Sequence, residues 1–236
     1  FIAGMPRSGT SLLDRIIDAH PQGAGVGELS LIEQFWATLN AAYDPDAEPK
    51  DAYKGVAPGK WKETAKAYIN RCRKISPART RRVANKSISN DLMLGLLNRL
   101  FIKAKLIHIV RDPRDVAVSC FFGDFNTQMY PWSTRLDCIA RAWSSSQRIM
   151  EHFSKVLDTP ILDVRYEELV GSPDEQLPRL IAYLGLDWDP QCQRFHELDR
   201  PIRTLSYDQV NQPINTRSVA RHENYARHLE SVDWPS

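Results

Sequence analysis

The chain has 236 residues, of which 42% are hydrophobic and 25% are charged, and its formal net charge at pH 7 is +2. This length favours a single domain. This net charge is too small to imply binding to nucleic acids or membranes through bulk electrostatics. The sequence contains no run of about 18 apolar residues, so no transmembrane helix is predicted. Any anion-binding site must therefore be built locally.

The four cysteines lie far apart and form no C-x-x-C pair: Cys72, Cys120, Cys138 and Cys192. Their spacing argues against a zinc site and against a dense disulfide framework. We therefore expect free thiols and a reducing, cytoplasmic location, although one or two disulfides are also compatible with the spacing.

Residues 1–18, FIAGMPRSGTSLLDRIID, predict the end of a buried strand, a glycine-framed loop and then a helix. The apolar residues of the helix recur on one face, at Leu12, Leu13, Ile16 and Ile17. The loop amides and the positive end of the helix dipole would together form an anion cradle. Only three residues precede Gly4, whereas strands usually have about five or six, so we expect the natural chain to extend upstream of Phe1.

The loop has the glycine spacing of the triphosphate-binding P-loop G-x-x-x-x-G-K-[ST], with Gly4, Gly9 and Ser11 in place. Thr10 stands where that loop has the lysine that reaches the β- and γ-phosphates, which disfavours ATP or GTP chemistry. Arg7 offers instead a cation that can hold a phosphate or sulfate through two hydrogen bonds. The alternative interpretation is a chance glycine-rich turn between a strand and a helix.

Hydrophobic periodicity and turn residues predict the remaining elements in chain order. Helices are expected over about 29–40, 61–75, 90–101, 134–157 and 174–184, with one more starting at 113, and strands near 81–86, 105–110 and 160–164. Loops are expected at 41–60 and at the aromatic-rich stretch 124–133. Because strands alternate with helices, the sequence predicts an α/β fold of P-loop type, with three layers and a central parallel sheet of about four or five strands.

Two polar residues are expected near the first loop, because ligands of parallel sheets bind beyond the carboxyl ends of the strands. Lys86 follows the strand that ends at Asn85, and Glu28 lies in the loop before the second helix. The alternatives are a solvated lysine for Lys86 and, for Glu28, a charge that complements a helix dipole.

A second strand-to-helix junction carries another cation. The apolar strand at 105–110 ends at Arg111, and Asp112 and Pro113 are typical of a helix start. Ser119 follows two turns into that helix. Two cationic junctions in one sheet predict a ligand with two anionic groups.

Hydrophobic periodicity fades towards the carboxyl terminus. The segment 203–228 is polar and basic, with Arg203, Arg217, Arg221 and Arg227. It is either an exposed tail or a segment that folds back over an anionic ligand.

Five motifs occur in order along almost the whole chain: PRSGT with Ser11-Leu12, Asn85-Lys86, IVRDPRDVAVS at 109–119, VRYEEL at 164–169 and DQVNQPI at 208–214. Together they resemble the sulfotransferases that use 3′-phosphoadenosine 5′-phosphosulfate (PAPS). The similarity is greatest to the branch with the protein-tyrosine sulfotransferases and the bacterial sulfotransferases attached to tetratricopeptide repeats. The resemblance implies one sulfotransferase domain over 1–236 and suggests a repeat domain upstream. It also implies that the segment 200–236 closes over the cofactor.

The resemblance assigns the cofactor-binding residues. The 5′-phosphosulfate would be held by Arg7, Ser8, Gly9, Thr10 and Ser11. The 3′-phosphate would be held by Arg111 and Ser119, which accounts for the second cationic junction. Tyr166 matches a position that contacts the nucleotide, and the tail would close through Ser206, Ser218 and Arg221.

The resemblance also assigns the catalytic residues: Glu28, Arg7, Lys86 and Ser206. Glu28 falls at the position of the general base, which removes the hydroxyl proton as the sulfuryl group transfers. Arg7 and Lys86 would neutralise charge on the sulfuryl oxygens and on the leaving phosphate. No metal ion is called for.

Four positions depart from the pattern of the secreted tyrosine-sulfating enzymes. Gly25 and Ala84 stand where those enzymes have cysteines, so the resemblance implies no disulfide there. Gln212 replaces a lysine of the tail, and His222 stands where tryptophan is common.

Two other functions stay open from the sequence: a phosphoryl-transfer enzyme similar to a nucleotide kinase, and a non-catalytic module that binds an anion. Turnover of ATP with Mg²⁺ would favour the first, and nucleotide binding without turnover would favour the second. For a sulfotransferase, the expected acceptor is a hydroxyl on a small molecule, a glycan or a peptide tyrosine. The loops 41–60 and 124–133 would shape its pocket, with Phe125, Tyr130 and Trp132 as candidates.

Overall fold

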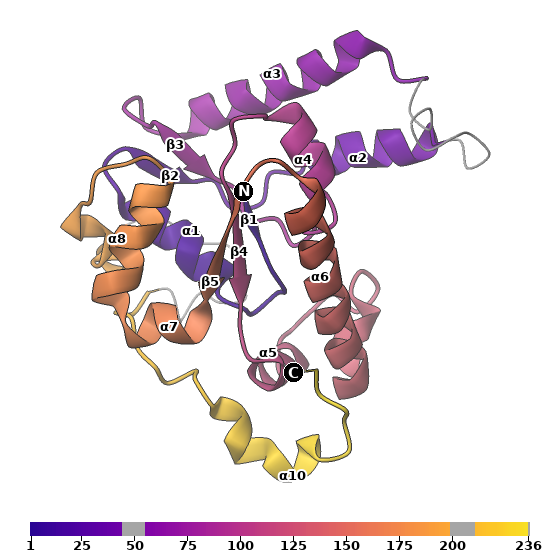
Figure 1. Cartoon of the computed structure of the whole chain (residues 1–236), viewed down its shortest axis with the longest axis vertical. Coiled ribbons are helices and arrows are strands. Elements are labelled where there is room, and N and C mark those ends of the chain that lie inside the picture. The colour runs from indigo at the N-terminus through magenta and orange to yellow at the C-terminus, as the bar shows by residue number, and fades with distance from the viewer. Residues whose placement is uncertain (44–54, 199–210, 236) are drawn as a thin grey trace.

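The computed structural model describes residues 1–43, 55–198 and 211–235 (Figure 1). Its strands are β1 (Ile2–Ala3), β2 (Gly23–Gly25), β3 (Arg82–Ala84), β4 (Leu106–Val110) and β5 (Ile161–Arg165). All the strand pairs are parallel, in a three-stranded sheet of order β1-β4-β5 and a two-stranded sheet of β2 and β3. The Ile2 N–H donates to the Asn85 carbonyl oxygen at 2.8 Å, which places the two sheets side by side. The predicted α/β fold with a parallel sheet is thereby confirmed.

The helices lie between and after these strands. They are α1 (Thr10–Ala19), α2 (Leu31–Ala41), α3 (Pro58–Ile75), α4 (Leu94–Leu100), α5 (Pro113–Phe121), α6 (Leu136–Val156), α7 (Tyr166–Gly171), α8 (Pro173–Tyr183) and α10 (Ala226–Leu229). The predicted helices therefore all exist, with shifts of a few residues at their ends.

The central strands are buried on both faces, as expected for a parallel sheet covered by helices. Ile107 and Ile109 of β4 pack on one face against α1, α7 and α8. Leu106, on the opposite face, packs with Leu94 of α4 and Met150 of α6. Because side chains alternate along a strand, one short strand thus joins both helical layers. The architecture has three layers (Figure 1).

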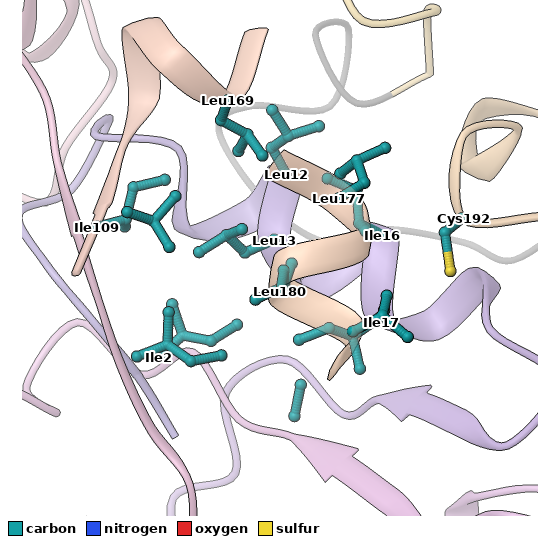
Figure 2. Close-up of a cluster of buried hydrophobic side chains, with 14 of the residues drawn as sticks. Ile2, Leu12, Leu13, Ile16, Ile17, Ile109, Leu169, Leu177, Leu180 and Cys192 are labelled. Atoms are coloured by element: carbon teal, nitrogen blue, oxygen red, sulfur yellow. The ribbon is translucent and has the colours of Figure 1, made fainter. Parts of the chain in front are cut away.

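The apolar face of α1 supplies much of the larger core, as its periodicity predicts. Leu13 and Ile16 are completely buried. Figure 2 shows the α1 side chains turned towards Leu177 and Leu180 of α8 and towards the sheet. Full burial of an aliphatic side chain of this size stabilises a fold by about 1.5–3 kcal/mol. This packing fixes the helix whose amino terminus ends the glycine-framed loop.

Two predicted helix ends are confirmed in detail. The Asp112 side chain accepts hydrogen bonds from the N–H groups of Arg114 and Asp115, at 2.8 and 3.4 Å, so it caps α5. Gly185 has a φ of +70° and follows Leu184, the residue that caps α8. Its N–H donates to the Ala182 carbonyl, in the turn with which helices commonly end.

Three local features differ from the sequence prediction. The strand β2 forms inside an expected loop, because Gly23 lets the chain approach α1 so closely that a Cβ there would lie 2.0 Å from the Ile17 carbonyl oxygen. The helix α4 starts later than expected, since the Asn90 side chain instead bonds the Ile2 carbonyl at 2.8 Å. The short helix α7 was not predicted. Residues 44–54, the centre of the expected loop 41–60, lie outside the described residues.

All four cysteines are free thiols, as expected. Among the described residues, none of the helices combines the length and the apolar character that crossing a membrane requires.

Candidate active site

The glycine-framed loop turns its backbone inward at the carboxyl end of β1. Gly9 has a φ of +109° and Arg7 a φ of +69°, so both adopt left-handed backbone. That conformation is rare for a residue with a side chain and is concentrated at functional sites. The Gly9 carbonyl accepts the N–H groups of Leu12 and Leu13, at 3.0 and 3.1 Å. The Gly9 carbonyl thus anchors the first turn of α1, and the positive end of the helix dipole lies at the loop.

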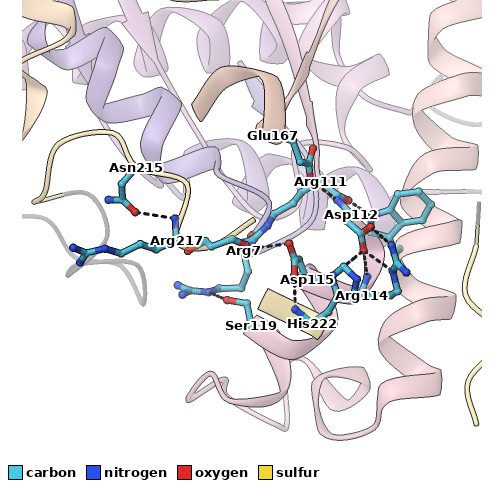
Figure 3. Close-up of polar contacts among 12 residues, drawn as sticks. Arg7, Arg111, Asp112, Arg114, Asp115, Ser119, Glu167, Asn215, Arg217 and His222 are labelled. Atoms are coloured by element: carbon cyan, nitrogen blue, oxygen red, sulfur yellow. Dashed lines mark hydrogen bonds and ion pairs between the residues drawn. The ribbon is translucent and has the colours of Figure 1, made fainter. Parts of the chain in front are cut away.

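Residues of the two cationic junctions lie side by side (Figure 3). Arg111 is 3% exposed, and its Nη1 donates to the Arg7 carbonyl oxygen at 3.0 Å. The Arg7 Nε donates to the Ser119 hydroxyl at 2.9 Å. The Arg111 guanidinium also lies over the Tyr166 ring, 4.6 Å from its centre. The structure thus brings together four residues that were expected, from positions far apart along the chain, to bind one ligand.

The arginines of this group are suited to bind an anion. Burial, together with the neighbouring guanidinium groups of Arg111 and Arg221, lowers the pKa of Arg7. The Nε of Arg111 is buried and has no hydrogen-bond partner among the described residues. A buried donor without an acceptor is costly, and a bound phosphate oxygen would satisfy it. The residues present therefore fit a phosphate-bearing ligand.

A cavity of about 150 Å³ lies between the loop and the described part of the tail. Its walls are formed by both segments: Arg7, Gly9, Ser11, Arg111, Tyr166 and Phe195 on one side, and Gln212, Pro213, Ile214, Asn215, Arg217 and Ser218 on the other. The Ser218 carbonyl accepts a hydrogen bond from Arg111 Nη2. Residues 211–218 therefore cover the cradle, while Ser206 lies outside the described residues.

Ser8 and Thr10 complete the loop in different ways. The Ser8 hydroxyl is buried and donates to the Met5 carbonyl oxygen at 2.6 Å, so it stabilises the loop turn. Thr10 is the first residue of α1. It follows Gly9, which lines the cavity.

Glu28 and Lys86 form an ion pair, with 2.7 Å between Oε1 and Nζ. The side chain of Lys86 is 7% exposed and that of Glu28 is 47% exposed. The Lys86 N–H also donates to the Gly27 carbonyl at 3.0 Å, which ties the two loops together. Lys86 is therefore not the solvated lysine of the alternative interpretation. The joint action of Arg7 with Lys86 stays a prediction.

Sequence reasoning missed Asp14, which lies behind the Glu28–Lys86 pair. Burial raises the pKa of Asp14 to about 7, against the opposing effects of the Lys86 charge and a hydrogen bond from the Gly27 backbone. One turn later on α1, the Asp18 Oδ1 accepts the Gly25 N–H at 2.9 Å. The available signal was the spacing of these two aspartates, which lie four residues apart on the helix that carries the apolar face.

The aromatic residues expected near the acceptor form a cluster. The ring centres of Phe125, Tyr130 and Trp132 lie 5.9–6.0 Å apart in each pair. Burial raises the pKa of Tyr130, and the charges of Glu28 and Glu33 raise it further. The loop that carries this cluster therefore lies on the Glu28 side of the site.

The described residues contain no group of three or more His, Cys, Asp or Glu side chains placed to hold a metal ion. The expectation that the ligand binds without a metal stays a prediction.

The chain is similar in sequence to a known protein family. Residues 1–190 match the model of the group described as the sulfotransferase family. An uncharacterised protein of Aquifex aeolicus is 28% identical over 98% of this chain, which spans 31% of that protein. A putative protein-tyrosine sulfotransferase of Caenorhabditis briggsae is 28% identical, with 93% of this chain and 78% of that protein covered.

Solved structures share the fold. The sulfotransferase domain of the Synechococcus PCC 7002 olefin synthase superposes with a TM-score of 0.68 at 21% identity, covering 100% of this chain and 88% of that domain. A mouse sulfotransferase complexed with PAP superposes with a TM-score of 0.53 at 16% identity, covering 98% of this chain and 81% of that one.

Proposed function

Because this chain belongs to the sulfotransferase family, we propose that it transfers a sulfuryl group from PAPS to a hydroxyl acceptor. The observation that carries the proposal is the pairing of two half-sites at the same edge of the sheet. One is the cradle with Arg111 and its unpartnered Nε. The other is the Glu28–Lys86 ion pair. The first suits a phosphorylated nucleotide, and the second suits removal of a proton from a hydroxyl group.

The cradle residues would hold the cofactor at two anionic ends. The loop from Arg7 to Ser11 would receive the 5′-phosphosulfate at the amino terminus of α1. Arg111 and Ser119 would receive the 3′-phosphate. Tyr166 closes the cavity between them. When bound, the cofactor supplies the sulfuryl group and a phosphate leaving group.

Glu28 is proposed as the general base. Lys86 holds its Oε1, and the half-exposed carboxylate remains open to an approaching hydroxyl group. As the acceptor oxygen bonds to sulfur and the sulfur–oxygen bond to the phosphate breaks, the hydroxyl proton would pass to Glu28. Lys86 is buried beside this point, so its charge is worth more there than in water. It would stabilise the negative charge that develops during transfer.

The acceptor is proposed to enter on the side of Phe125, Tyr130 and Trp132. Tyr130 and Trp132 are partly exposed above the buried Phe125, on the Glu28 side, and present an apolar surface that suits the body of a hydroxyl-bearing molecule. A peptide tyrosine, a glycan and a small phenol all remain candidate acceptors.

Calorimetric titration with adenosine 3′,5′-bisphosphate, without added metal, tests the proposal. We expect binding that Arg111→Ala weakens by at least about 30-fold, because about 2 kcal/mol or more is lost when a buried charged partner is removed. Arg99→Ala is the matched control: Arg99 also lies over an aromatic ring, 4.7 Å from the centre of Trp61, but outside the site.

Transfer of labelled sulfate from PAPS to a panel of hydroxyl acceptors then tests the reaction itself. Absence of nucleotide binding by the folded protein would overturn the proposal. Hydrolysis of ATP with Mg²⁺ would in that case support the kinase-like alternative, and tight nucleotide binding without turnover on any acceptor would support the non-catalytic one.

A further inference from the structure

The carboxylate of Asp115 connects the phosphate-binding arginine to the carboxyl-terminal segment. Asp115 lies on α5, and its side chain is completely buried. Its Oδ1 accepts the backbone N–H of His222 at 2.8 Å and lies 3.0 Å from His222 Nδ1. Its Oδ2 lies 3.6 Å from Arg111 Nη2. Figure 3 shows Asp115 between the two partners.

Arg111 is in turn held by groups from three segments. Its Nη1 donates to the Arg7 carbonyl of the loop, its Nη2 donates to the Ser218 carbonyl of the tail, and its face lies on the Tyr166 ring. None of these three contacts supplies a negative charge. Asp115 is therefore the carboxylate that balances Arg111 within the described part of the chain.

A buried carboxylate is costly unless it is paired and hydrogen-bonded. Asp115 is both, but its second oxygen makes no hydrogen bond within the described residues. The carboxylate thus serves two groups at once, one on the tail and one at the cradle. Because the Asp115 side chain contacts both residues, a displacement of the tail at His222 would also displace Arg111.

We infer that Asp115 is a positioning residue, which orients Arg111 towards the 3′-phosphate and couples this orientation to the seating of residues 211–235 through His222. This inference rests on the proposed function, because it assigns the 3′-phosphate to Arg111. It goes beyond that function in naming the residue that joins phosphate recognition to tail closure.

The direction in which phosphate affinity changes when the Asp115 charge is removed distinguishes positioning from simple electrostatic repulsion. A carboxylate close to a phosphate site repels the phosphate, so its removal by itself would tighten binding. If Asp115 positions Arg111, its removal weakens binding instead. The effect must also be confined to the 3′-phosphate, because the 5′ end is held by the loop.

The experiment compares the dissociation constants of adenosine 3′,5′-bisphosphate and adenosine 5′-monophosphate for each variant. For Asp115→Asn, which keeps the side-chain shape, we expect the bisphosphate constant to rise about 10- to 100-fold, as for a typical coupling between sites. The monophosphate constant should change by less than about 3-fold, which is below that range. His222→Phe keeps a ring and the backbone N–H bond to Asp115 but removes the contact from Nδ1. It should therefore raise the ratio of the bisphosphate constant to the monophosphate constant in the same direction by a smaller factor, and make the tail more sensitive to limited proteolysis.

Asp163→Asn is the matched control, because Asp163 also pairs with a histidine, at 2.9 Å from His108 Nδ1, but outside the cradle. The ratio of its dissociation constants for the bisphosphate and the monophosphate should equal that of the wild type. An unchanged or increased preference for the bisphosphate in Asp115→Asn and His222→Phe would overturn the inference and leave the proposed function intact. If Asp115→Asn does not fold, His222→Phe alone decides. A wild type that binds neither nucleotide would overturn the proposed function as well.

Discussion

At the residue scale, the site depends on charges held in places that water does not freely reach. Lys86 is buried beside Glu28, and Arg111 is buried beside Asp115. Each pair combines a cation with a carboxylate, so neither leaves an uncompensated charge inside the protein. The two pairs differ in exposure: Glu28 is half-exposed, whereas Asp115 is completely buried. This difference suits a carboxylate that exchanges protons in one pair and a fixed positioning group in the other.

The role proposed for Glu28 predicts a specific loss of turnover. Glu28→Gln should lower kcat for sulfuryl transfer by about 10²- to 10⁴-fold, because an amide cannot accept the hydroxyl proton. The affinity for adenosine 3′,5′-bisphosphate should stay the same, since Glu28 lies apart from the cradle. Steady-state kinetics and calorimetry measure the two effects. Glu63→Gln, on the exposed surface of α3, is the control. Full turnover of Glu28→Gln would contradict the assignment.

The raised pKa of Asp14 predicts a pH-dependent stability. Its pKa is about 7 in the folded protein, whereas an unperturbed aspartate titrates near 4. Between these values the folded state keeps a proton that the unfolded state releases, so the contribution of Asp14 to stability falls as the pH rises from about 4 to about 7. Asp14→Asn removes this dependence.

Urea unfolding at pH 5 and pH 8 checks this prediction. The unfolding free energy of the wild type should fall by about 1.4 kcal/mol per pH unit between pH 5 and pH 7 because of Asp14. Asp14→Asn should not show this loss, so its stability relative to the wild type should be about 2–3 kcal/mol higher at pH 8 than at pH 5. Asp124→Asn, at an exposed position, should show no such change. A difference between Asp14→Asn and the wild type that does not vary with pH would refute it.

At the element scale, five of the candidate site residues follow the carboxyl ends of strands. Arg7 follows β1, Lys86 follows β3 and Arg111 follows β4, while Glu28 and Tyr166 come after β2 and β5. Parallel strands place these ends at one edge, which explains how residues separated by up to 159 positions in the chain meet there. The helices contribute mainly through their first turns, where the positive end of the helix dipole favours anions.

The loop before α1 predicts a strict requirement for glycine at position 9. A Cβ on Gly9 would lie 2.7 Å from Tyr166 Cδ2 and 2.9 Å from Ile109 Cδ1, in a left-handed backbone. Gly27 is the matched control, because it is also left-handed but has open space around its Cα. Gly27→Ala should cost about 1–2 kcal/mol from the backbone alone. Gly9→Ala should cost about 1–3 kcal/mol more from the clash.

Chemical denaturation measures the free energy of unfolding of both variants. Calorimetry should also show weaker nucleotide binding for Gly9→Ala. Equal losses of stability in the two variants would show that the contact of Gly9 with Tyr166 is not restrictive.

At the scale of the whole molecule, one core holds the cradle to the sheet. The helices α1, α7 and α8 and the strands β1 and β4 share a single cluster of buried side chains (Figure 2). The described tail residues Ile214 and Val219 pack against the same cluster. The loop, the sheet and the cover of the cavity are therefore parts of one packed unit, and we expect them to unfold together.

A substitution in this core tests the expectation. Leu180 of α8 is 1% exposed, so Leu180→Ala should lower the free energy of unfolding by about 2–5 kcal/mol. The control is Ile102→Ala: Ile102 is 80% exposed, and its loss should change stability by less than about 0.5 kcal/mol. Far-UV and near-UV circular dichroism should report the same transition in both variants. Separate transitions would show that the α8 side of the core unfolds independently.

The sequence by itself determined the parts of this protein that depend on local chemistry. Short stretches of sequence were enough to predict three elements: the periodic leucines and isoleucines predicted α1, Asp112 predicted the start of α5, and the unbroken apolar run predicted β4. The family motifs, spread over the chain, likewise indicated the fold.

Only the tertiary structure decided the features that depend on contacts between distant segments. The strand β2 has glycines rather than strand-forming residues, and it exists because those glycines let it pack against α1. Asp14 and Asp115 look like ordinary polar residues of helices until Lys86, Arg111 and His222 are brought against them. Burial and pairing, which set the charge of such groups, are properties of the packed chain and not of any short stretch of it.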